Sequence, residues 1–78
     1  METRRLNKVE EKYIERELAP YGDKTLTGGS VTIDDNDCFI YYLSIDGFYP
    51  WNTEGKKICA RLKETLSADK VYVNAISI

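Results

Sequence analysis

The side chains in this sequence that could act on another molecule are carboxylates and aromatic rings. Three aspartates lie within residues 34–37, and the chain has six tyrosines and one tryptophan but no histidine. Without histidine, acid–base chemistry near neutral pH would need a carboxylate or lysine with a strongly shifted pKa, and 78 residues offer little interior for that. Neither serine nor cysteine has a nearby base at the spacing of an activated nucleophile. We therefore expect a binding protein that is not an enzyme and has no cofactor.

The aspartate cluster raises the question of a metal site, because clustered carboxylates are ligands for Ca²⁺ and Mg²⁺. An EF-hand loop starting at Asp34 would need glycine at its sixth position and glutamate at its twelfth, where this chain has Phe39 and Ile45. Aspartate and asparagine also favour tight turns, since their side chains bond to nearby backbone. We therefore predict a solvated hairpin turn at residues 34–37 and no resident metal.

The aromatic residues favour binding to another protein, because tyrosine and tryptophan dominate the energetics of interfaces. An acidic hairpin beside aromatic side chains would fit a basic surface, such as the nucleic-acid groove of another protein, where carboxylates replace phosphates. Small acidic inhibitors carried by phages and other mobile elements work in this way, so we expect an anti-CRISPR-like inhibitor of a nucleic-acid-handling complex. The predicted partner-binding residues are Asp34, Asp35, Asp37, Tyr42, Tyr49, Trp51 and Tyr72.

Two other modes of binding stay open. A single-stranded RNA-binding module could stack bases on sheet tyrosines, Tyr41 or Tyr42 with Tyr72. Against it, the strand lacks the Lys/Arg-Gly start of the RNA-recognition signature, and its flanking aspartates would repel phosphates. The basic residues that favour RNA are Lys56, Lys57, Arg61 and Lys63. The second mode is a homodimer formed through an open sheet face.

Residues 38–45 are predicted to be the central strand that positions these side chains, because an apolar or aromatic residue occupies nearly every position. The odd-numbered residues from Phe39 to Ile45 should face the helices, and the even-numbered ones should be partly open. Residues 31–33 are predicted to be a short strand at the sheet edge, and residues 70–78 the last strand.

Apolar residues at three- and four-residue spacing predict two helices. The first covers residues 3–19, with Thr3 as N-cap and Pro20 at its end, and the second covers residues 53–66, with Asn52 as N-cap. Residues 21–30 are predicted to be a loop. The order α-β-β-α-β predicts one α+β domain over residues 1–78. The predicted domain has a single-layer sheet of three strands in chain order, and the last strand is parallel to the second. Both helices pack on one face of the sheet, so the layout is ferredoxin-like.

The overall composition is typical of a small globular domain, with 42% hydrophobic and 31% charged residues and no apolar run near the ~20 residues that span a bilayer. The N-terminal residues lack a signal peptide's apolar centre, and Cys38 and Cys59 do not form a Cys-x-x-Cys pair, so we expect a cytoplasmic protein. Because two short helices cannot cover both faces of an apolar sheet, we also predict an exposed aromatic surface.

Overall fold

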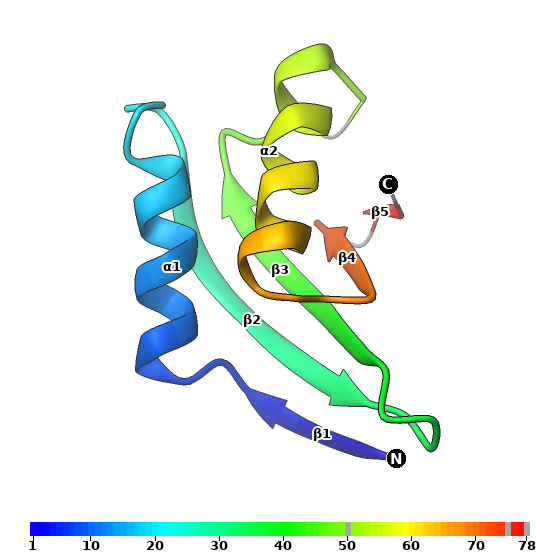
Figure 1. The fold of residues 1–78 in the computed structure, drawn as a ribbon. Helices are drawn as coiled ribbons and strands as arrows, with labels where there is room; N and C mark the ends of the chain where they lie inside the picture. The colour runs from blue at the N-terminus through cyan, green and yellow to red at the C-terminus, as the bar shows by residue number, and fades with distance from the viewer. Residues whose placement is uncertain (50, 75, 78) are drawn as a thin grey trace.

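A mixed β-sheet with two helices on one of its faces forms the fold of the computed structural model, which describes residues 1–49, 51–74, 76 and 77 (Figure 1). The elements of the described residues are β1 (Glu2–Arg5), α1 (Lys8–Leu18), β2 (Thr25–Ile33), β3 (Phe39–Asp46), α2 (Thr53–Thr65), β4 (Lys70–Val73) and β5 (Ile76–Ser77). The predicted α+β class is confirmed, and so is the placing of both helices on one face. No helix in the described part of the chain is both long and apolar enough to cross a bilayer.

The strands lie in the sheet in chain order, β1-β2-β3-β4-β5. Adjacent strands are antiparallel except β3 and β4, which are parallel, as predicted for two strands joined through a helix. The prediction of three strands is wrong, because β1 and β5 extend the sheet at both edges, and β2 is therefore not an edge strand. The ferredoxin-like layout holds only for the succession of elements from β1 to β4. In that fold another strand separates the two strands that a helix joins, whereas β3 and β4 pair directly.

The N-terminal residues form a strand where the spacing of apolar residues predicts helix. The helix begins at Lys8 because Asn7 caps it: the Asn7 side chain accepts from Glu10 N at 2.8 Å, and the Glu10 carboxylate accepts from Asn7 N at 2.9 Å. Thr3 is therefore not the cap. Its hydroxyl instead lies 3.1 Å from that of Thr32, across the β1–β2 pair.

Residues 25–30 belong to β2, although their glycines predict a loop. They pair with the C-terminal half of β3, with a bulge between Leu26 and Gly28. Gly29 serves a close approach: a Cβ there would lie 2.8 Å from Leu6 Cδ1 and 2.9 Å from Tyr42 O. The glycine therefore lets the neighbouring chain segments pack against this strand.

The predicted last strand, residues 70–78, is also wrong in its extent. It ends at Val73, and Asn74, with φ of 54°, turns the chain back so that β5 pairs antiparallel with β4. Ala75 and Ile78 of the predicted strand, and Pro50 before α2, lie outside the described residues. The second helix is confirmed at its start, where the Asn52 side chain accepts from Gly55 N at 2.7 Å.

The core lies between the helices and one face of the sheet. Tyr41, Leu43 and Ile45 are buried there and Phe39 is partly buried, which confirms the predicted inner face of β3. The buried helical side chains that meet this face are Ile14, Leu18, Ile58, Cys59 and Leu62. On the opposite face of the sheet, where Tyr42 and Ser44 are exposed, the described residues place no helix (Figure 1).

Candidate partner-binding surfaces

Two tyrosines stand at the centre of the open sheet face. Tyr42 on β3 and Tyr72 on β4 are register partners, and their rings stack with centroids 5.1 Å apart and planes 9° from parallel. Because neighbouring strands are about 4.8 Å apart, the rings stand side by side on the sheet and each covers one face of the other. Tyr42 remains 43% exposed. The pair therefore presents ring edges and outer faces and is no flat platform for two bases.

The surroundings of this pair are mostly polar, and the two charged residues among them are both basic. The strand register places the following residues on the same face: Thr3, Arg5, Ser30, Thr32, Ile40 and Lys70. Tyrosines with adjacent hydroxyl groups are typical of protein-binding surfaces, since a tyrosine ring supplies a large contact area at low conformational cost.

The acidic turn is present as predicted, but its carboxylates differ in what they do. The Asp34 carboxylate accepts from the backbone N of Asn36 at 2.8 Å and of Cys38 at 3.0 Å, and bonds from Cys38 and Asn36 lower its pKa. Asp35 forms an exposed ion pair with the N-terminal ammonium at 2.8 Å. Asp37 is exposed, with φ of 59°. Asp34 therefore holds the turn, and Asp35 and Asp37 are the carboxylates that a partner would meet.

Replacing Asp34 by alanine should lower the urea midpoint of unfolding, because the turn then loses both side-chain acceptor bonds. The matched change Asp35→Ala removes the same charge from an exposed pair and should leave the midpoint nearly unchanged. Circular dichroism during urea titration measures both. Equal midpoints for the two variants would contradict the structural role of Asp34.

Tyr49 and Trp51 form a second aromatic pair, with centroids 5.4 Å apart and rings tilted by 50°. They are 51% and 68% exposed. They follow β3, whereas the acidic turn precedes it, and eight residues of strand span about 26 Å. The seven predicted binding residues are thus spread over the acidic turn, the open face and the far end of β3 (Figure 1).

A basic groove lies between α2 and β4, with a volume of about 350 Å³, and it joins two of the lysines predicted to favour RNA to a third lysine from the strand, which was not among those predicted. Lys56 and Lys63 line it from the helix, seven residues apart, and Lys70 and Tyr72 line it from the strand. None of the three lysines forms an ion pair among the described residues. Asp69 is the one carboxylate in the lining, and its Oδ2 accepts from Phe39 N at 2.7 Å.

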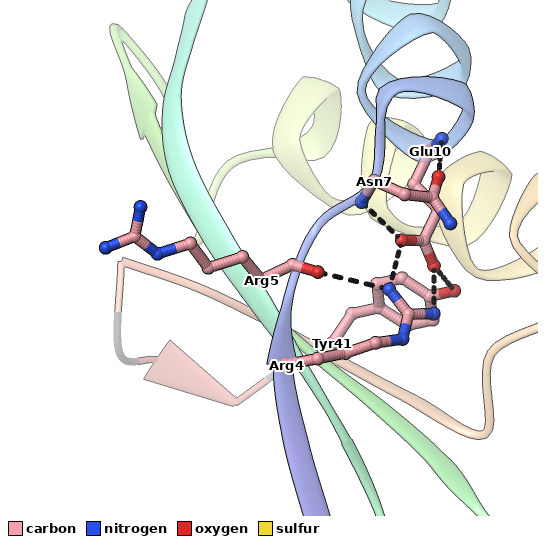
Figure 2. Close-up of polar contacts among 5 residues, drawn as sticks. All are labelled: Arg4, Arg5, Asn7, Glu10 and Tyr41. Atoms are coloured by element: carbon pink, nitrogen blue, oxygen red, sulfur yellow. Dashed lines mark hydrogen bonds and ion pairs between the residues drawn. The ribbon is translucent and has the colours of Figure 1, made fainter.

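A buried polar cluster centred on Glu10 joins β1, α1 and β3 (Figure 2). Glu10 is 7% exposed, and its carboxylate accepts two bonds from Arg4, at 2.7 and 3.0 Å, one from the Tyr41 hydroxyl at 2.5 Å and one from Asn7 N. Burial alone would raise the pKa of Glu10, but the bonds from Arg4, Tyr41 and Asn7 outweigh it and lower the pKa to about 2. All of these partners belong to the fold itself, so we interpret the cluster as structural.

Comparisons of this chain with protein-family models, with curated proteins and with solved structures give no match. The function is therefore inferred from the surfaces themselves.

Proposed function

We propose that the protein is a non-enzymatic protein-binding module whose contact surface is the open sheet face around Tyr42 and Tyr72. The observation that carries this proposal is a stacked tyrosine pair, of which Tyr42 is 43% exposed, on the sheet face that no helix of the described residues covers. Each ring fixes the other, so little side-chain freedom remains to be lost when a partner binds. The hydroxyl groups around the pair supply hydrogen bonds at the edge of such a contact.

The acidic turn beyond one end of this surface suits a partner protein with a basic region, and the specific role that we propose is inhibition of a nucleic-acid-handling complex, as by phage inhibitors. Asp35 and Asp37 would take the place of phosphates beyond one end of the open face. A cytoplasmic location belongs to the same proposal and is supported by Cys38 and Cys59, which are both free. A homodimer through the same face is the competing use of the tyrosine pair.

The test is capture of partners from the native host by the full chain, followed by mass spectrometry. Changing Tyr42 and Tyr72 together to threonine, which keeps strand propensity, should reduce the captured partner at least tenfold. Tyr13→Ala is the matched control, because Tyr13 is 39% exposed on α1, in the helix layer. Equal loss in the control, or none in the double variant, would remove the open face from the proposal. Analytical ultracentrifugation of the purified protein measures its mass in solution, and twice the chain mass would favour the homodimer.

Single-stranded RNA binding is the second candidate, and the lysine groove beside Tyr72 is the observation that favours it. A gel shift with RNA of mixed sequence at 50 and 200 mM salt separates the two functions. Binding that weakens steeply with salt, and that Lys56→Gln with Lys63→Gln abolishes, would favour RNA. The protein-binding proposal expects no shift at either concentration.

A further inference from the structure

The edge of β2 that faces away from β3 is only partly covered. The nine residues of β2 exceed the four of β1, which pairs with Ser30–Ile33 alone. Leu6 N then donates to Gly29 O at 3.4 Å, and the chain leaves the sheet to form α1. In the described part of the chain, no strand pairs with residues 25–28 on this side (Figure 1). Unpaired peptide groups on such an edge can pair with an added strand.

A groove runs along this uncovered edge, between β2 and α1. Two cavities of about 410 and 300 Å³ adjoin there, because Glu15 and Leu26 line both. Leu6 and Leu26 are the apolar side chains of the larger cavity, and the smaller one adds Leu18, Ala19 and Tyr21. Gly28 leaves the strand open, since a Cβ at this position would meet nothing within 4 Å. A glycine inside a strand often marks a site where another backbone approaches closely.

The charge of the groove indicates which side chains would enter it. Glu11 and Glu15 lie one helical turn apart on α1 and line the groove, and neither forms an ion pair among the described residues. Arg5 and Lys24 are the basic residues in the lining, and the Lys24 ammonium already pairs with Glu54 at 2.7 Å. The α1 side of the groove is therefore acidic and favours a cationic ligand, whereas Arg5 lies on the strand side.

We propose that this groove binds an extended, basic segment of a partner protein, which adds as a strand to the uncovered edge of β2. Four residues of edge accommodate about 13 Å of added strand. Alternate side chains of that strand face the helix layer, and lysines there would lay their methylene chains on Leu26 and reach Glu11 and Glu15. This surface lies at the edge of the sheet and shares only Arg5 with the open face, so it goes beyond the function proposed above.

The test uses synthetic peptides and the full chain. An acetylated, amidated hexapeptide of alternating lysine and threonine should perturb the NMR amide signals of residues 25–29 and slow their hydrogen exchange. A peptide of the same sequence with two backbone nitrogens methylated keeps every charge but loses strand hydrogen bonds, so it should bind roughly tenfold more weakly or worse. The same affinity for both peptides would overturn the proposal, because it would indicate charge attraction alone.

Two variants complete the test. Changing Glu11 and Glu15 together to glutamine should weaken peptide binding at least fivefold, whereas the control Glu64→Gln, on α2, should not change it. The double threonine variant of Tyr42 and Tyr72 should bind the peptide with unchanged affinity. The test of the groove is therefore independent of the test of the open face. Unchanged binding by the glutamine variant, or perturbations centred on the acidic turn instead of β2, would refute the assignment.

Discussion

Replacing Glu10 by glutamine should lower the free energy of unfolding by about 3 kcal/mol, since breaking a buried charge pair from one side costs several kcal/mol. The amide cannot accept the paired bonds of Arg4, and the Tyr41 hydroxyl loses its charged acceptor. The Arg4 side chain is 35% exposed, so water compensates part of its loss. Urea unfolding at pH 7, followed by circular dichroism, measures the change. Glu11→Gln, at an exposed neighbouring position, should shift stability by less than about 0.5 kcal/mol.

The stability difference between the wild type and Glu10→Gln should depend on pH. The pKa of Glu10 falls from an ordinary 4.5 to about 2 on folding, so its charged form contributes stability above pH 4.5 that is lost as the pH falls towards 2. A shift of this size corresponds to about 3 kcal/mol. The stability difference between the wild type and Glu10→Gln should therefore shrink between pH 5 and pH 2. A constant difference over that range would mean that the cluster does not depend on the Glu10 charge.

The parts of the fold that local patterns determine could be predicted from the sequence. Alternation along β3 identified its buried face, and the polar residue before α2 identified its N-cap. The spacing of Asn7 and Glu10 in the sequence also matches a capping box, and it would have placed the start of α1 correctly. β1 was not predictable in this way. Its four polar residues show no apolar alternation, and they form a strand because β2 offers a partner and Arg4 reaches Glu10.

The candidate surfaces were predictable in kind but not in arrangement. The surplus of aromatic residues indicated exposed rings, and Tyr42 and Trp51 are exposed. The stacking of Tyr42 on Tyr72 depends on the parallel register of β3 and β4, which no local pattern specifies. The use of the Asp34 carboxylate within its own turn likewise depends on backbone geometry. The uncovered edge of β2 follows from the difference in length between β1 and β2, and both lengths are set by tertiary pairing.

Replacing Gly47 by alanine should destabilise the protein by about 3 kcal/mol, for two reasons that act together. Gly47 has φ of 75°, a conformation that costs an L-residue about 1–2 kcal/mol. A Cβ at this position would also lie 2.2 Å from the backbone oxygen of Asp23, and backbone cannot move aside as a flexible side chain does. Forcing extra atoms into a packed site typically costs about 1–3 kcal/mol. Urea unfolding measures the change.

The Gly47→Ala substitution should also disturb an ion pair next to Asp23. Lys24, next in the chain, pairs with Glu54 at 2.7 Å through a side chain that is only 5% exposed, so this pair ties the start of β2 to α2. Displacing Asp23 would pull Lys24 away from that pair. Gly22→Ala is the matched control, because a Cβ at this position meets nothing within 4 Å. This substitution should change the free energy of unfolding by less than about 1 kcal/mol. Equal stability of the two alanine variants would show that the backbone of Asp23 moves away from the added Cβ at position 47 at little cost.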